Sequence, residues 1–153
     1  MRNLLALAFV FLTACSKLLI PGTSIPDQPD TRAVLEVFGK YRDALEARDA
    51  DGVIALTAPS YFDPGDAAHA RPPMDFEALK KKVAQDLSAV KSLKLDLTVR
   101  DLRVEGSKAN IDYFATLSYA VAVPTGEKWK RESDDARLRL LKIGGEWKIV
   151  AGL

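Results

Sequence analysis

The chain has 153 residues, of which 48% are hydrophobic and 28% are charged, with 22 basic against 21 acidic side chains. This composition is that of one globular domain, and it excludes a disordered tail and a multispan membrane protein. A formal net charge of +1 provides no long-range field for a polyanion, so no nucleic-acid partner is expected.

The N-terminus has the pattern of a secretory signal. Arg2 precedes a short apolar run that extends to Leu12, and Ser16 and Lys17 end the apolar character. The run is shorter than the roughly 20 apolar residues that a membrane-crossing helix needs. We therefore expect residues 1–14 to be a signal peptide that is removed, and not a permanent transmembrane anchor.

The only cysteine of the chain follows this segment directly. A cut after Ala14 by ordinary signal peptidase would place Leu12 at a position where a small residue is preferred. The sequence Leu12-Thr13-Ala14-Cys15 instead resembles the lipobox of bacterial lipoproteins. That resemblance implies a lipidated Cys15 at the start of the mature chain. The alternative for this residue is a buried structural thiol.

A lipidated Cys15 has consequences for location. Two acyl chains are what stable anchoring on a bilayer requires, so the membrane is an expected partner and the domain should be extracytoplasmic. The resemblance to lipoproteins also implies, from Ser16 after the cysteine, that the outer membrane is favoured over the inner one in a cell with two membranes.

Residues 15–31 follow the signal and have no apolar periodicity. They hold Pro21, Pro26, Pro29 and Gly22, which predicts an extended tether. At about 3.1 Å per residue, such a tether would lift the domain roughly 45 Å from the lipid. The near-repeat of Ile-Pro within it either docks on the domain or a partner, or serves only as a spacer.

Three helices are predicted in the first part of a domain that spans residues 32–153. Apolar residues recur at helical spacing in each, and Asp30 or Thr31 can cap the first. Tyr61 and Phe62 favour a brief strand, and the proline-rich segment 63–73 favours a surface loop. The helices are expected over residues 32–45, 53–56 and 76–90.

The rest of the chain alternates with a period of two, which predicts an antiparallel meander. A change of phase near Arg100 predicts a bulge, and Gly144 and Gly145 predict a tight hairpin turn. The strands are expected over residues 93–104, 111–121, 129–143 and 147–153. Helices that cover one face of a curved sheet of about four long strands make an α+β fold.

Two stretches resemble the nuclear transport factor 2-like superfamily. Residues 41–56 are similar to its helical hairpin, and residues 138–149 are similar to its last hairpin. The resemblance covers about residues 32–153 and implies a cone-like α+β fold. Members include ketosteroid isomerases, polyketide cyclases and dehydratases, but also non-catalytic binding domains, so the fold alone selects no activity.

Resemblance to the ketosteroid isomerases implies a hydrogen-bonding tyrosine on the first helix, an aspartate base after the second and a protonated acid beyond. Tyr41 matches the first role. Asp63 stands near the second, and Asp134 or Asp135 near the third. The favoured alternative is that Tyr41 packs in the core, Asp63 caps a turn and the two aspartates sit on a bulge.

Other chemistry finds little support in the sequence. His69 is the only histidine, and no spacing of metal ligands accompanies it, so no metal site is expected. Neither a Gly-x-Ser-x-Gly motif nor a phosphate-binding glycine loop is present, which disfavours nucleophilic hydrolysis and predicts no cofactor. Basic residues alternate with acidic ones around Trp129, which favours a solvated strand with cross-strand charge pairs.

Two functions follow as hypotheses. The preferred one is a membrane-tethered, non-catalytic module that binds a ligand or a protein partner in the cell envelope. The alternative is a ketosteroid isomerase-like enzyme that transfers a proton or dehydrates a small apolar substrate. A homodimer through the exposed sheet face is a further option that the superfamily resemblance implies. The candidate pocket or interface residues are Tyr41, Tyr113, Trp129 and Trp147.

Overall fold

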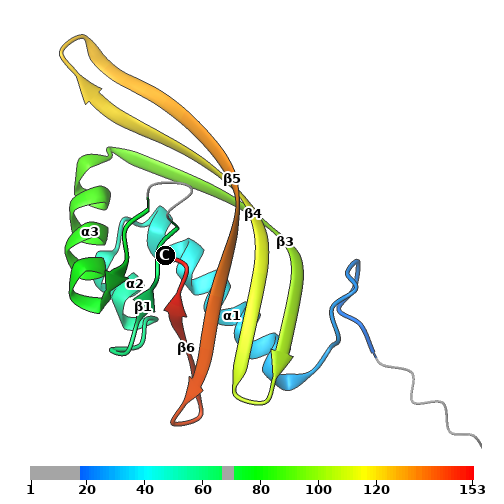
Figure 1. The fold of residues 1–153 in the computed structure, drawn as a ribbon. Coiled ribbons are helices and arrows are strands. Elements are labelled where there is room, and N and C mark those ends of the chain that lie inside the picture. The colour runs from blue at the N-terminus through cyan, green and yellow to red at the C-terminus, as the bar shows by residue number, and fades with distance from the viewer. Residues whose placement is uncertain (1–17, 67–70) are drawn as a thin grey trace, which may run out of the picture.

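Helices lie against one face of a curved four-stranded sheet (Figure 1). The computed structural model describes residues 18–66 and 71–153, so the signal segment, Cys15 and His69 lie outside the described residues. None of the described helices combines the length and the apolar character that crossing a membrane requires. In chain order the elements are α1 (Pro29–Glu46), α2 (Ala50–Ala55), β1 (Phe62–Asp63), β2 (Met74–Asp75), α3 (Phe76–Ala89), β3 (Ser92–Glu105), β4 (Lys108–Val123), β5 (Gly126–Ile143) and β6 (Glu146–Ala151).

The large sheet is a meander with the strand order β3-β4-β5-β6, and each neighbouring pair is antiparallel. The register between β3 and β4 shifts between Val99 and Asp101, which is the expected bulge. Gly144 and Gly145 both have positive φ angles, 59° and 90°, as a tight hairpin turn demands. The expected α+β fold is confirmed.

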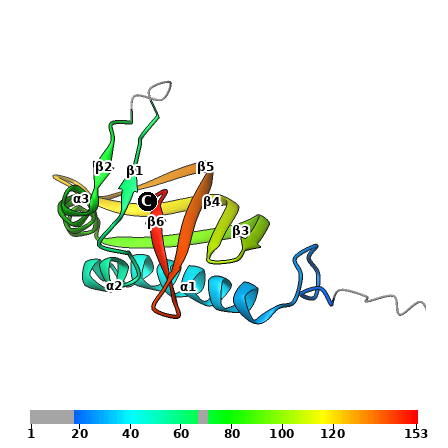
Figure 2. The same ribbon diagram turned by 60° about the horizontal axis from the view of Figure 1, so that its bottom comes forward.

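The core lies between the helices and the inner face of the sheet, which is the face that they cover (Figure 2). Alternate residues of the strands point to this face because the side-chain period of a strand is two. Helices α1 and α3 each contribute one apolar stripe of side chains to this core. The largest fully buried side chains are Val34, Val53, Leu79, Ile111, Leu138, Leu140 and Ile149.

Helix α1 begins at Pro29, three residues before the predicted start. Proline suits this first position because its ring already holds a helical φ angle and its missing N–H is not needed there. Gln28 precedes it without a side-chain cap. Asp30, one of the predicted caps, instead accepts hydrogen bonds from Lys142 Nζ at 2.6 Å and Trp147 Nε1 at 3.3 Å. The start of α1 is thus joined to the last hairpin.

Residues 18–28 fold into a tight turn that we call the N-terminal hook. Leu19 and Pro26 form a β-bridge, and the Ile20 N–H donates to the Ile25 carbonyl at 2.9 Å. The Ile25 side chain is only 5% exposed and belongs to the core. The folded part of the chain therefore begins before residue 32, and the chain left over for a tether is shorter than the sequence pattern suggests.

Strand β5 is continuous through Asp134 and Asp135, where the sequence favoured a bulge. Asp134 pairs with Ala115 and Asp135 with Phe114 in regular register, so the aspartates do not sit on a bulge. The hairpin of β4 and β5 projects past the helices (Figure 1), and both faces of this part of β5 meet water. An apolar alternation is not needed there, so its absence from the sequence does not end the strand.

The hook gives the first testable expectation. Replacement Ile25→Ala should lower the free energy of unfolding by about 2–4 kcal/mol, because it leaves a cavity at a buried site. Replacement Leu18→Ala is the control, and it should change stability by less than about 0.5 kcal/mol because that side chain is 77% exposed. Urea unfolding followed by tryptophan fluorescence measures both, and equal effects would contradict the packed hook.

Candidate functional site

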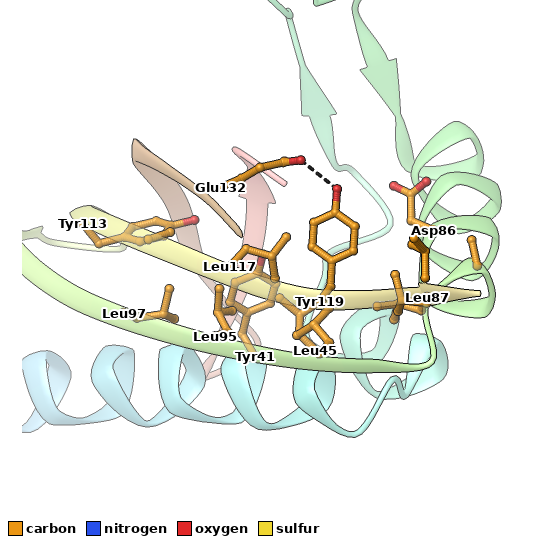
Figure 3. A pocket seen from close by; sticks show the side chains of 15 residues that line it. Tyr41, Leu45, Asp86, Leu87, Leu95, Leu97, Tyr113, Leu117, Tyr119 and Glu132 are labelled. Carbon is orange, nitrogen blue, oxygen red and sulfur yellow. Dashed lines mark hydrogen bonds between the residues drawn. The ribbon is translucent and has the colours of Figure 1, made fainter. Parts of the chain in front are cut away.

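A cavity of about 490 Å³ opens between α1, the end of α3 and the inner face of the sheet (Figure 3). Its volume lies in the range of small-molecule sites in proteins. Most of the lining is aliphatic. The side chains that line it include Leu45, Leu87, Leu93, Leu95, Leu97, Leu117 and Val121, together with Tyr41, Tyr113 and Tyr119.

Strand periodicity explains this lining. Alternate residues of β4 from Tyr113 to Val121 point inward. On β3 the leucines at alternate positions, Leu93, Leu95 and Leu97, do the same. Tyr41 and Leu45 are four residues apart on α1, so they lie one above the other on the same helix face. Figure 3 shows the Tyr41 ring rising from α1 toward Leu95 and Leu117 of the sheet.

Two tyrosine hydroxyls provide polarity at the inner end of the cavity. The ring of Phe38 holds this pair, because it contacts Tyr113 edge to face at a centroid distance of 4.9 Å and stacks on Tyr41 at 6.5 Å. Burial raises the pKa of Tyr113 to about 12. Burial also raises the pKa of Tyr41 far above its usual range, and the nearby Tyr113 hydroxyl adds to the effect. Both phenols are therefore protonated at neutral pH, and the Tyr41 hydroxyl donates to the Tyr113 hydroxyl, whose own proton is not used in that bond.

A third tyrosine and two carboxylates lie toward the outer end. Tyr119 Oη donates to Glu132 Oε1 at 2.7 Å, a bond that raises the pKa of the phenol (Figure 3). Lys130 Nζ lies 6.0 Å from the centroid of the Tyr119 ring. Asp86 of α3 pairs with Lys82 at 2.5 Å. The carboxylates thus stand at the mouth, and the phenols stand inside.

The burial of the lining residues shows which end is open. Tyr113 and Leu95 are buried, while Asp86, Ala89 and Glu132 are exposed. The mouth therefore lies between the C-terminal end of α3 and the projecting hairpin of β4 and β5. A ligand that enters there meets the Tyr41 and Tyr113 hydroxyls at the far end.

Asp63 does not line this cavity. The residue is 6% exposed, and its carboxylate accepts hydrogen bonds from the Gly65 N–H at 2.8 Å and the Gly152 N–H at 3.0 Å. Tyr61 also holds the C-terminal end, since its hydroxyl donates to the Leu153 carbonyl and accepts from the Leu153 N–H. Asp63 therefore holds the C-terminal end of the chain, and the structure does not place it beside Tyr41.

Asp135 lies on the outer face of the sheet, opposite to the cavity. It forms an ion pair with Arg100 at 3.1 Å, and that guanidinium lies 5.1 Å from the centroid of the Phe114 ring. Asp134 faces inward but is not part of the cavity lining. Within residues 18–66 and 71–153, no cluster of His, Cys, Asp or Glu is arranged to hold a metal ion.

The four residues proposed for a pocket or interface separate into three places. Tyr41 and Tyr113 line the cavity. Trp129 is 60% exposed on the projecting hairpin, and Trp147 is 4% exposed in the core beside Asp30. The sequence pattern did not single out Tyr119 and Glu132. Tyr119 shares the face of Tyr113 along one strand, whereas Glu132 becomes visible only once the register of β4 and β5 is known.

No protein-family model matches the sequence, and neither does any curated protein. Solved structures are similar to this chain. One is a proposed dehydratase of the NTF2-like family from Streptomyces avermitilis, with a TM-score of 0.66 and 17% identity over 82% of this chain and 95% of that one. A proposed scytalone dehydratase from Novosphingobium aromaticivorans has a TM-score of 0.65 and 12% identity over 80% of each chain.

A protein with a cystatin-like fold from Nostoc punctiforme, of unknown function, has a TM-score of 0.62 and 14% identity over 80% of this chain and 87% of that one. At such identities the similarity establishes the fold. The chain has the NTF2-like, cystatin-like fold, and its structural neighbours include a proposed aromatic ring hydroxylase besides the dehydratases.

The tyrosines give a pH-dependent expectation. The pKa of Tyr113 is raised to about 12, against about 10 in an unfolded chain. A raised pKa contributes stability that is fully present below the unfolded value and is lost as the pH rises through the folded value. The free energy of unfolding should therefore fall between about pH 10 and pH 12. Tyr113→Phe should flatten this decline more than Tyr119→Phe, because Tyr113 is the more buried of the two.

Urea unfolding at a series of pH values measures the decline. Phenolate absorbance provides an independent check, since the native protein should titrate at a higher pH than the same protein in urea. Identical titration curves for the two states would show that the cavity tyrosines are solvated.

Proposed function

We propose that the protein is a lipid-anchored, non-catalytic binding module of the cell envelope, whose cavity takes a small, uncharged, largely apolar ligand with one hydrogen-bond-accepting oxygen. The observation that carries this proposal is the aliphatic cavity of about 490 Å³ with the Tyr41 and Tyr113 hydroxyls at its inner end. Ligand sites of this kind combine apolar walls with a few polar groups that fix orientation.

The polar groups specify the ligand further. Protonated phenols donate, so a carbonyl, ether or hydroxyl oxygen suits the inner end. At the mouth Asp86 is paired with Lys82, whereas the exposed carboxylate of Glu132 accepts from the neutral Tyr119 phenol and disfavours an anion by like-charge repulsion. A neutral ring compound with a single oxygen meets both conditions.

The anchor is supported by the sequence alone. The segment from Leu12 to Cys15 resembles a lipobox, and a short apolar run precedes it at the position of a signal peptide. Diacylation of the Cys15 thiol would hold the domain on a membrane without a spanning helix. The intact mass of the protein extracted from its own membrane tests this point.

Ligand binding can be tested by filling the cavity. We expect 2-naphthol, whose fluorescence reports an apolar environment, to bind the wild-type protein. Ala115→Phe should weaken binding at least tenfold, because the new ring occupies the cavity that Ala115 lines. Ala122→Phe is the matched control on the same strand, since Ala122 is exposed and lies outside the lining.

In the same assay, Tyr41→Phe should weaken binding by less than about tenfold, because a single neutral hydrogen bond contributes about 0.5–1.5 kcal/mol. Equal binding by the Ala115→Phe and Ala122→Phe variants would show that 2-naphthol does not occupy this cavity, and would remove the main support for the proposal.

A second candidate function is proton transfer or dehydration of the bound molecule. It is favoured by the carboxylate of Glu132 at the cavity, beside a phenol, and by the proposed dehydratases among the solved structures. In this case Glu132 is the general base and the inner tyrosines polarise the substrate oxygen. Asp63 and Asp135 have no part in it, because neither lines the cavity.

The exchange of the acidic α-hydrogens of 2-tetralone for deuterium, followed by NMR, tests this second candidate. A proton-transfer enzyme should accelerate the exchange, and Glu132→Gln should lower the rate by about 100-fold or more. Asp135→Asn is the control and should leave the rate unchanged. No acceleration by the wild-type protein would leave the binding module as the function.

A further inference from the structure

We propose that the N-terminal hook seats the domain directly on the bilayer that holds its anchor, through Leu18 and Leu19, with the cavity mouth turned away from that bilayer. This inference rests on the lipid anchor of the proposed function. It adds a lipid-contacting surface and an orientation, and hence the side from which the ligand arrives.

The hook is a fixed part of the domain. Its turn is closed by the Thr23 N–H, which donates to the Ile20 carbonyl at 3.0 Å, and by the Asp27 N–H, which donates to the Leu18 carbonyl at 2.7 Å. Ile25 is buried in the core, so the hook does not swing freely. Whatever its outer side chains contact is therefore held at a defined place on the domain.

The start of the hook exposes two large apolar side chains. Ile20 packs against the core, whereas Leu18 is 77% exposed and Leu19 is 49% exposed. Single exposed leucines are common on protein surfaces, but two adjacent ones next to a lipid attachment point suit the acyl boundary of a bilayer.

The length of chain before the hook decides the occupant. Two residues, Ser16 and Lys17, separate Cys15 from Leu18, so the Cα atoms of Cys15 and Leu18 are three residue steps apart and lie at most roughly 11 Å from each other. An extended tether of residues 15–31 would have reached roughly 45 Å, but residues 18–28 are folded onto the domain. The acylated cysteine therefore holds the two leucines at the lipid surface.

Charge at this end does not oppose the contact. Asp27 is paired with Arg32 through two bonds of 2.5 and 2.6 Å, and Asp30 is paired with Lys142. The carboxylates near the hook are thus compensated by cations. Lys17 precedes Leu18 in the sequence, and a basic residue next to an anchor favours anionic headgroups.

The arrangement of the elements sets the orientation. The hook lies at one end of the domain, and α3 and the projecting hairpin of β4 and β5 lie at the opposite end in both views (Figures 1 and 2). The cavity mouth is formed at that far end by Asp86, Ala89 and Glu132. A domain seated on its hook therefore receives its ligand from the aqueous side, and not from the acyl chains of its own bilayer.

Fluorescent labels at two positions test the seating. The lipid blocks the thiol of Cys15, the only native cysteine, so a cysteine introduced by Leu18→Cys or by Trp129→Cys is the single site for a nitrobenzoxadiazole label. The full-length lipidated protein is reconstituted into vesicles of phosphatidylethanolamine and phosphatidylglycerol that contain nitroxide-bearing acyl chains. We expect strong quenching at position 18 and none at position 129, where aqueous iodide should quench instead.

A flexible Gly-Ser segment inserted between Lys17 and Leu18 tests whether the hook itself binds lipid or is only kept near the bilayer by the lipidated Cys15. If the hook binds lipid, quenching at position 18 should persist in the insertion variant, and it should fall severalfold when Leu19→Ser is added. Leu19 is half exposed, so this change should not unfold the domain, and unchanged urea unfolding verifies that.

The outcomes distinguish the two proposals. A lipidated protein whose label at position 18 is no better quenched by lipid than the label at position 129 overturns the seating alone. Loss of quenching at position 18 in the Gly-Ser insertion variant also overturns the seating. In that case the short link to the lipidated Cys15, and not binding of the hook to lipid, would explain the quenching. An intact mass without lipid on Cys15 overturns both the anchor and the seating, whereas the 2-naphthol assay on the same protein still reports on the cavity.

Discussion

The apolar inner face of β4 is longer than the helices can cover, and the site depends on this mismatch. A strand of 16 residues extends for roughly 50 Å at about 3.3 Å per residue, whereas the 18 residues of α1 extend for roughly 27 Å at 1.5 Å per residue. Ile111 and Tyr113 are buried in the core, where Tyr113 contacts Phe38 of α1, but Leu117, Tyr119 and Val121 along the same face remain partly exposed. The uncovered part of the strand, closed on one side by α3, is the cavity.

The same mismatch distributes polarity along the cavity. Where the helices cover the sheet, Tyr113 is buried and Tyr41 is partly buried, and both phenols stay protonated. Toward the end of β4, water reaches the strand, and a carboxylate such as Glu132 is tolerated beside Tyr119. The interior therefore donates hydrogen bonds, and the mouth presents the Glu132 carboxylate, which together favour a neutral ligand with an accepting oxygen.

The N-terminal hook and the C-terminal end are each held to the domain by a buried side chain. Ile25 of the hook packs in the core, and the Asp63 carboxylate accepts a hydrogen bond from the Gly152 N–H. Gly152 has a φ angle of 98°, and a Cβ atom there would lie 2.0 Å from the Arg137 carbonyl oxygen, so only glycine fits. This fastening accounts for a buried carboxylate that, by its place in the sequence, had suggested a catalytic base.

The sequence by itself determined the local structure: the helical stripes, the bulge near Arg100 and the Gly144-Gly145 turn. Each depends on residues that are near neighbours along the chain. The tertiary structure alone decided that Glu132 meets Tyr119, that Asp63 holds Gly152 and that Ile25 joins the core. These contacts depend on strand register and on packing between distant segments. Neither can be predicted from a short run of residues.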